Sequence, residues 1–599
     1  MNRWNRPFVF GGALVLNAAF CLLISELLNL LNPDIGLPFV NVIVSLLLFL
    51  LVQLVLSGFF GRLSGAMVMT LLLATLTSLV NYFKQYFRGD PFFAGDAVMV
   101  GDADKIVVDL RYALEPRLPL AILVLAIGMI LAIRLRSRIT SPFRRILTSV
   151  VSGLLLVSLV TGIIWNGTIR RDWLAMEDYP WNALAGTREN GFLIPFVRSF
   201  ADLLPQKPPD ATIAKTDYAI TQPVSAARAE QANVIVVMSE AFSDLEKIRS
   251  LKTSEPVMPF YRSLQQDANT IDGSLLVSVF GGSTSCTEFE FLTGSSMYYV
   301  NDGLVPYMKW FDEPAHGLAD LFNQQGYRSV AIHPFHASYY DRQRVYPLMG
   351  FSSYITMEQF PEGAEKVRGF ISDQSHVDQI IRTFQEKGPD QRLFLFTISM
   401  QNHFPYDHAE EGMASLPYQI RLPDMQDAAS AELFLSLMRL SDDALASLVR
   451  YADSINEPTM IVIFGDHLPG LSSGFRQFYH DLMGKDFAEL GLSETRKMYE
   501  TPFMIWANYP LPDEDIGLTS PNFLSAKVAE LAKADLSPYY QYIGSLNREI
   551  MAMSNKILVL KDGTTIDRDH VPAELSDELG IYWSYQYDNI IGRSDARQK

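Results

Sequence analysis

Five long apolar segments occupy the first 165 residues of the chain. A helix that crosses the hydrocarbon core of a bilayer needs roughly 20 apolar residues, and each segment meets or approaches that length. Their number and length favour five transmembrane helices over a cleaved signal peptide or the buried helices of a soluble core. The segments are Phe8–Leu31, Leu37–Phe60, Ser64–Phe83, Leu118–Ile133 and Ile146–Trp165.

Basic residues between these segments predict how the chain is oriented. The N-terminus, the loop after the second segment and the loop after the fourth contain arginines and no Asp or Glu. Because Lys and Arg concentrate on the cytoplasmic side of membrane proteins, the N-terminus is predicted to be cytoplasmic. Five spans of a multi-pass cell-membrane protein then place everything after Trp165 outside the cytoplasm.

The part of the chain after Trp165 is acidic, with 36 Lys and Arg against 58 Asp and Glu. Nucleic-acid binding proteins present a basic stripe, so this composition excludes nucleic acid as a partner. The two cysteines, Cys21 and Cys286, cannot form a disulfide framework or a thiolate zinc site. The external part therefore depends on its own core, which about 370 residues can supply.

Composition divides the chain into four segments. Residues 1–165 are the transmembrane domain, and residues 166–231 start as an aromatic interfacial helix and continue as a linker rich in Pro and Ala, where cleavage near Ala229 remains open. Residues 232–545 are predicted to be the catalytic domain. Residues 546–599 form a C-terminal extension, in which a Lys-Asp-Gly turn within 556–566 predicts a hairpin.

Residues 232–545 alternate between strands and helices. Amphipathic helical stretches, such as Gly317–Gln325 and Ala431–Ala452, separate apolar runs typical of strands buried on both faces. This alternation predicts an α/β domain with a mainly parallel sheet, in which ligands bind beyond the carboxyl ends of the strands. The apolar runs are Asn233–Ser239, Ser329–Ile332, Leu393–Ser399, Met460–Phe464 and Phe503–Trp506.

Polar side chains follow four of these strands directly. Carboxylates and imidazoles brought to one edge of a sheet supply the oxygen and nitrogen donors that a divalent metal requires. The sequence therefore predicts a metal site at this edge. The residues are Glu240, His333, Asn402 with His403, and Asp466 with His467.

The segment Gly281–Phe289 (GGSTSCTEF) is a candidate for the nucleophile. Two glycines followed by hydroxyl residues and an apolar run predict a tight turn into a helix N-terminus. The positive end of a helix and a nearby metal would both stabilise an alkoxide. A plain N-cap is the alternative interpretation.

Four motifs resemble the lipoteichoic acid synthase group of phosphoglycerol transferases, in the alkaline phosphatase and sulfatase superfamily. They are Val236–Phe242 (VVMSEAF), Gly281–Glu290 (GGSTSCTEFE), Met400–Tyr406 (MQNHFPY) and Phe464–Gly470 (FGDHLPG). The resemblance implies that Thr284 is the nucleophile and that Glu240, Thr284, Asp466 and His467 surround one metal. That metal is usually manganese, and the same ligands would accept zinc or magnesium. The resemblance also places His403 in the substrate pocket.

A fifth segment, His333–Tyr346, resembles the stretch with which this family holds glycerol phosphate. By that resemblance His333, Tyr340 and Arg342 bind substrate, and Tyr340 stands where the best-known members have tryptophan. The planar fork of Arg342 suits a phosphate, to which it can donate two parallel hydrogen bonds. His336 has no counterpart and is expected to be structural or at the rim.

The resemblance implies a membrane-anchored enzyme that takes glycerophosphate from the membrane lipid phosphatidylglycerol through a phospho-threonine. The acceptor stays open among a glycolipid, a polyglycerophosphate chain and a glucan. The alternatives are a phosphoethanolamine transferase, which usually has zinc and several disulfides, and a phosphodiesterase that uses water. A sulfatase is excluded because Cys286 is followed by Thr-Glu-Phe rather than by the x-Pro-x-Arg context of such enzymes.

Overall fold

The computed structural model describes most of the chain. The described residues are 6–96, 115–135, 138–174, 176, 182–203, 207–208, 231–301, 303–406, 409–470, 473–568 and 570–592. They form two compact units, the first within residues 6–203 together with Phe487–Glu489 and the second within the remaining residues from 207 to 592. Ala229, near which cleavage was left open, lies outside the described residues.

The first unit contains the five predicted membrane helices. Each is long and apolar enough to cross a bilayer, which confirms the predicted spans to within a few residues. The largest differences are at the end of the fifth helix, where α-helical geometry stops at Leu159 and a π-helix continues to Ile164, and at the end of the third, which continues to Arg88. The helices are α1 (Arg6–Leu27), α2 (Phe39–Phe60), α3 (Leu63–Arg88), α4 (Arg117–Arg134) and α5 (Pro142–Leu159).

These helices bury polar side chains and expose apolar ones. Inside the bundle, Asn17 Nδ2 donates to Gln53 Oε1 at 3.0 Å, whereas Phe39 and Leu154 are 77% and 64% exposed. Gly58 lets α2 and α5 approach closely, since a Cβ there would lie 2.1 Å from Ser149 Oγ. Small residues and polar pairs at helix interfaces, with apolar outer faces, are typical of helices packed in lipid.

Two short helices follow the bundle, α6 (Ala183–Asn190) and α7 (Leu193–Arg198). The Glu26 carboxylate of α1 accepts a hydrogen bond from the Phe192 backbone N–H at 3.2 Å and another from Asn32 Nδ2 at 3.1 Å. This buried carboxylate therefore ties the segment between α6 and α7 to the first membrane helix.

An eight-stranded sheet forms the centre of the second unit, with the order β10-β2-β9-β8-β1-β7-β3-β4. Strands β8, β1, β7, β3 and β4 run parallel, which confirms the predicted mainly parallel α/β domain. β9 pairs antiparallel with both neighbours. The strands are β1 (Asn233–Ser239), β2 (Thr270–Leu276), β3 (Arg328–His333), β4 (Ser353–Thr356), β7 (Leu393–Ile398), β8 (Thr459–Gly465), β9 (Glu500–Ala507) and β10 (Gly517–Thr519).

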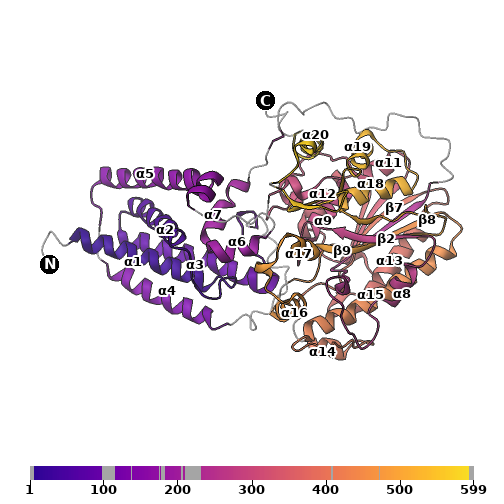
Figure 1. Cartoon of the computed structure of the whole chain (residues 1–599), viewed down its shortest axis with the longest axis horizontal. Helices are drawn as coiled ribbons and strands as arrows, with labels where there is room; N and C mark the ends of the chain where they lie inside the picture. Colours follow the sequence, from indigo (N-terminus) through magenta and orange to yellow (C-terminus); the bar gives the residue numbers. More distant parts are fainter. Residues whose placement is uncertain are drawn as a thin grey trace. The chain divides into compact units, whose positions relative to one another are not determined.

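Helices cover both faces of this sheet (Figure 1). α8, α13 and α15 lie on one face, and α9, α11, α18 and α19 lie on the other. The helices of this unit are α8 (Pro259–Leu264), α9 (Thr284–Thr293), α10 (Pro306–Lys309), α11 (Leu318–Asn323), α12 (Arg342–Leu348), α13 (Asp373–Gln385), α14 (Ala409–Ala414), α15 (Ala429–Ser454), α16 (Ser473–Met483), α17 (Leu492–Lys497), α18 (Pro521–Leu531), α19 (Pro538–Leu546) and α20 (Ser576–Tyr587).

Two smaller sheets complete the unit. β5 (Lys366–Val367) and β6 (Phe370–Ile371) form a short hairpin. β11 (Ile550–Met553), β12 (Ile557–Leu560) and β13 (Thr565–Asp567) form an antiparallel sheet, which confirms the hairpin predicted within 556–566. The Asn555 backbone N–H donates to Ser278 Oγ at 3.1 Å, so this extension packs on the residues that follow β2.

Candidate active site

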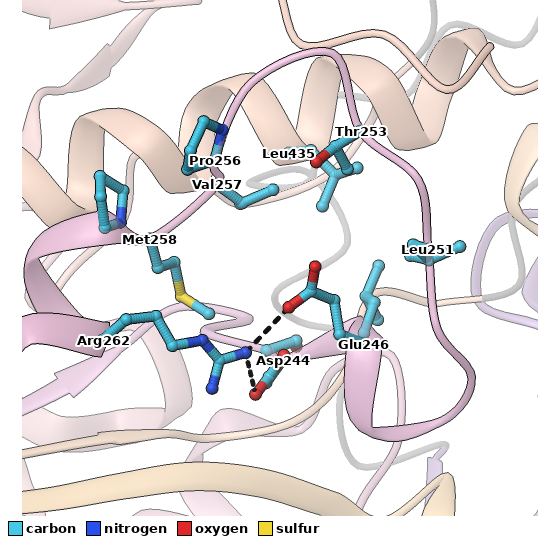
Figure 2. A pocket seen from close by; sticks show the side chains of 12 residues that line it. Asp244, Glu246, Leu251, Thr253, Pro256, Val257, Met258, Arg262 and Leu435 are labelled. Carbon is cyan, nitrogen blue, oxygen red and sulfur yellow. Dashed lines mark hydrogen bonds and ion pairs between the residues drawn. The ribbon is translucent and has the colours of Figure 1, made fainter. Parts of the chain in front are cut away.

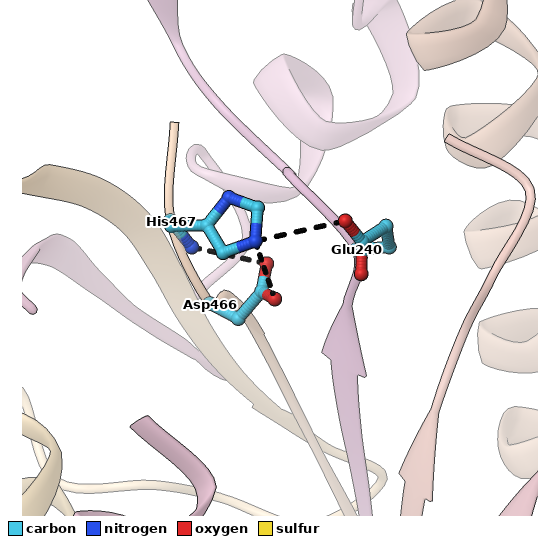
Figure 3. A group of neighbouring side chains, drawn as sticks. All are labelled: Glu240, Asp466 and His467. Carbon is cyan, nitrogen blue, oxygen red and sulfur yellow. Dashed lines mark hydrogen bonds and ion pairs between the residues drawn. The ribbon is translucent and has the colours of Figure 1, made fainter. Parts of the chain in front are cut away.

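Three of the predicted metal ligands meet where β1 and β8 end. Their ligand atoms all lie within 4.8 Å of one another, and Figure 3 shows the three side chains converging. His467 Nε2 is 3.2 Å from Asp466 Oδ2 and 3.6 Å from Glu240 Oε1. The three side chains meet because of the register of the sheet, in which the last residues of β1 and β8 are paired directly. The residues after both strands therefore emerge side by side.

The backbone around Asp466 holds this carboxylate in one orientation. Asp466 Oδ1 accepts hydrogen bonds from the backbone N–H groups of Ala241 at 2.8 Å and His467 at 3.0 Å. The preceding residue is Gly465, where a Cβ would lie 1.9 Å from the Phe242 carbonyl oxygen. Only glycine permits this approach, which explains the first letter of the Gly-Asp-His motif.

The atoms of this cluster that could ligate a metal fit a divalent cation. His467 Nδ1 is 2.9 Å from the Leu468 carbonyl oxygen, which only accepts, so Nδ1 carries the proton. In the neutral imidazole the Nε2 lone pair is then the one that can bind a metal. Asp466 Oδ2 and His467 Nε2 are both buried without a hydrogen-bond partner among the described residues. Burial, and next the Asp466 carboxylate, raise the pKa of Glu240 well above its usual range. Two carboxylates and one imidazole are a common ligand set for such an ion.

Thr284 lies beside this cluster at the N-terminus of α9. Its side chain is close enough to the Glu240 carboxylate to favour the charged form of that carboxylate. In the preceding turn, Gly281, Gly282 and Ser283 have φ angles of 66°, 144° and 65°. The first two residues are glycines, which adopt such angles readily. The turn into a helix predicted for Gly281–Phe289 is therefore confirmed, and it places a hydroxyl next to the metal ligands.

The other four candidate residues lie in one electrostatic neighbourhood. His333 ends β3, and burial followed by the Arg342 charge lowers its pKa well below the usual range, with smaller effects of His376 and His403. Arg342 lies over the Tyr340 ring at 5.1 Å and also acts on the Glu240 carboxylate. The His403 ring stacks on Phe404 with centroids 4.4 Å apart. His336, expected at the rim, is 46% exposed and lies 3.7 Å from Glu358.

The structure adds one residue that the sequence reading missed, Glu288. Glu288 Oε2 accepts a hydrogen bond from Arg342 Nε at 3.0 Å and lies 2.9 Å from Arg342 Nη2. Both side chains are at most 1% exposed. Arg342 Nη1 has no hydrogen-bond partner among the described residues. A spacing of four residues from Thr284 puts Glu288 one helical turn further along the same face. This spacing is the sequence feature from which Glu288 could have been predicted as a site residue.

A cavity of about 340 Å³ lies apart from the candidate residues, none of which lines it. The residues that line it start three positions after Glu240 in the sequence. Apolar side chains of 251–259 and Leu435 form part of its wall (Figure 2). Arg262 bridges Asp244 at 2.7 Å and Glu246 at 3.0 Å along its wall. Its charged groups are thus already paired with one another.

Glu290, on α9, gives a prediction for stability. Burial raises the pKa of Glu290 to about 8, so it holds a proton that the unfolded chain releases above pH 4.5. The folded state therefore loses stability as pH rises from 4.5 towards 8. Glu290→Gln cannot ionise, so we expect its apparent Tm, relative to wild type, to increase between pH 5 and pH 8. Thermal unfolding of the detergent-solubilised chain checks this, and a pH-independent difference would contradict it.

The family model described as Sulfatase matches residues 232–534. This match spans half of the chain and contains the metal cluster and Thr284. The chain belongs to the sulfatase family. Membership agrees with the resemblance and the fold class predicted from the sequence.

Two curated relatives extend the comparison of this sulfatase-family chain. A candidate cyclic beta-1,2-glucan modification protein of Rhizobium meliloti (strain 1021) is 27% identical over 570 residues, which cover 92% of this chain and 86% of the relative. A lipoteichoic acid synthase-like protein of Bacillus subtilis (strain 168) is 24% identical over 297 residues, which cover 49% of this chain and 45% of the relative.

Two solved structures have the same fold as this sulfatase-family chain. The Streptococcus pyogenes phosphoglycerol transferase in complex with sn-glycerol-1-phosphate aligns with a TM-score of 0.50 and 23% identity, covering 62% of this chain and 88% of that one. The integral membrane lipooligosaccharide phosphoethanolamine transferase A from Neisseria meningitidis aligns with a TM-score of 0.51 and 11% identity, covering 86% and 95%. The second alignment extends beyond the catalytic domain into the membrane helices.

Proposed function

We propose that the chain is a metal-dependent phosphoglycerol transferase that moves glycerophosphate from phosphatidylglycerol to a glucan. The observation that carries the proposal is the Thr284 hydroxyl at the start of α9, close enough to act on Glu240 of a buried Glu-Asp-His cluster. The relative that matches 92% of this chain bears a glucan-modification name, which supports a glucan over the other acceptors. The phosphoglycerol transferase among the solved structures supports phosphoglycerol as the transferred group.

The residues suit a two-step transfer. In the first step Thr284 Oγ attacks the phosphorus of the lipid, the bond to the diacylglycerol oxygen breaks, and that oxygen takes up a proton. In the second step a glucan hydroxyl attacks the glycerophosphoryl-threonine, and Thr284 regains its proton. His403 is half-buried beside the site, and we assign it to the leaving or attacking oxygen.

Glu240, Thr284, Asp466 and His467 would hold the metal, which we take to be manganese, with zinc or magnesium as the alternatives. When bound, the cation supplies Lewis-acid stabilisation to phosphoryl oxygens. His333, Tyr340 and Arg342 would bind the head group. The arginine distribution of the membrane loops supports an N-terminus in the cytoplasm and a catalytic domain outside it.

The domain division remains part of the proposal. We assign residues 1–165 to the membrane domain, 166–231 to the interfacial helix and linker, 232–545 to catalysis and 546–599 to the extension. The second unit is built around its own eight-stranded sheet with helices on both faces, which supports a separately folded catalytic domain.

The donor and the acceptor can be tested together on the full chain in lipid nanodiscs with manganese. Nanodiscs of phosphatidylglycerol are expected to release diacylglycerol and to yield a neutral β-glucan heavier by glycerophosphoryl groups, measured by mass spectrometry. Phosphatidylethanolamine nanodiscs are expected to yield neither product. Transfer from phosphatidylethanolamine alone would replace the proposal by phosphoethanolamine transfer, and diacylglycerol release without a modified glucan would assign water or another acceptor.

A further inference from the structure

The Glu288–Arg342 pair is isolated from solvent. Glu288 is 0% and Arg342 1% exposed. The hydroxyl-bearing rings of Tyr307 and Tyr346 are close enough for both charges to act on them. Although burial opposes the charged guanidinium, Glu288 raises the pKa of Arg342 well above its usual range. A buried arginine and carboxylate in this geometry form a charged pair whose net charge is zero.

The pair also restricts how Arg342 can meet a phosphate. Nε and Nη2 both face Glu288 Oε2, at 3.0 and 2.9 Å, so the side-on fork expected to bind phosphate is already used. Nη1 is the buried nitrogen without a hydrogen-bond partner among the described residues. Because Thr284 and Glu288 are four residues apart on α9, a single helix holds both the nucleophile and the carboxylate that fixes Arg342.

We propose that Glu288 is a specificity-determining residue, which positions Arg342 and cancels its charge so that the site accepts phosphodiesters in preference to phosphomonoesters. A phosphodiester carries one negative charge and a phosphomonoester carries nearly two at pH 8. Interaction energies scale with the product of the charges, so an uncompensated Arg342 would attract the monoester about twice as strongly as the diester. Glu288 removes this advantage of the monoester. The proposal rests on the proposed function, since it concerns the phosphoryl group that Thr284 attacks.

The first measurement is the ratio of activities on aryl phosphodiesters and aryl phosphomonoesters. Wild-type protein with manganese is expected to prefer bis-p-nitrophenyl phosphate over p-nitrophenyl phosphate. In Glu288→Gln the ratio of kcat/KM values should shift towards the monoester by about tenfold or more. A role confined to folding would lower both activities together and leave the ratio unchanged, which would overturn the proposal.

Two further variants separate charge from structure. Glu288→Asp keeps the negative charge and should retain the wild-type preference even if its total activity falls. Glu290→Gln removes a neighbouring carboxyl of α9 whose hydrogen bonds go to Ser278, Ser296 and the Met297 backbone rather than to Arg342. It should leave the ratio unchanged. A ratio that shifts equally in Glu290→Gln would also overturn the proposal.

Binding without turnover gives an independent readout. In a Thr284→Ala background, glycerophosphoglycerol should bind more tightly than sn-glycerol-1-phosphate, and Glu288→Gln should reduce that difference about tenfold in Kd. Isothermal titration of the detergent-solubilised chain measures both ligands. If Glu288→Gln does not fold, tighter binding of the monoester in the Thr284→Ala chain alone contradicts the proposal. A preference for diesters combined with no transfer from any lipid would instead refute the proposed function and leave this inference standing.

Discussion

Replacement of Thr284 by alanine is expected to lower glycerophosphate transfer by at least about 1,000-fold, because the reaction loses the oxygen that attacks phosphorus. Thr284 is at the start of α9 and only 8% exposed, and alanine is accommodated there as a good helix former. The variant should therefore keep the wild-type apparent Tm within a few degrees. Diacylglycerol release and glucan modification measure the activity.

The matched control for this prediction is Ser285→Ala, one residue further along the same helix. Ser285 Oγ is buried without a hydrogen-bond partner among the described residues, so its removal leaves no other group unsatisfied. We expect this variant to keep activity within a few-fold of wild type. Equal losses in the two variants would show that the effect comes from α9 as a whole and not from the Thr284 oxygen.

Loss of one carboxylate oxygen at Asp466 is expected to have the second largest effect. Asp466→Asn can keep the acceptor that receives the Ala241 and His467 backbone N–H groups. The amide nitrogen that replaces Oδ2 cannot bind a cation. We expect bound metal to fall from one ion per chain to near zero and transfer to fall at least about 100-fold. Chelation of the wild-type chain should have the same effect, reversibly.

Stability distinguishes this loss of metal from misfolding. Without metal, Asp466→Asn should have a higher apparent Tm than wild type, because it relieves the repulsion between Asp466 and Glu240. With manganese, wild type should gain stability by mass action and Asp466→Asn should not. Glu290→Gln, which replaces another buried carboxyl, serves as the control and should keep the manganese-dependent increase in apparent Tm. A manganese shift that survives in Asp466→Asn would rule out this cluster as the metal site.

The metal cluster could be predicted because it depends on local rules. Glu240, Asp466 and His467 each follow a continuous apolar run, and the carboxyl ends of parallel strands meet at one edge of a sheet. β1 and β8 are also adjacent, so the residues after them meet. The membrane helices were predictable for a similar reason, since their length and apolar character are set by the bilayer.

The features that were missed depend on contacts between distant parts of the chain. β9 contains an apolar run like the parallel strands, but it pairs antiparallel with β8 and β2, and hydrophobicity does not encode direction. β2, with Asp272, Gly273 and Ser274 in its middle, lacks a continuous apolar run. The pairing of Glu288 with Arg342 joins residues 54 positions apart, so no local pattern could predict that the arginine fork is occupied.

The most direct test of the account is the mass of the Thr284 peptide. The purified full chain, incubated with manganese and phosphatidylglycerol in the absence of a glucan, is digested and analysed by mass spectrometry beside Thr284→Ala. The account predicts one glycerophosphoryl group on the Thr284 peptide of wild type, its absence from the variant and its loss when glucan is added. An unmodified Thr284 peptide in a chain that releases diacylglycerol would contradict the phospho-threonine intermediate.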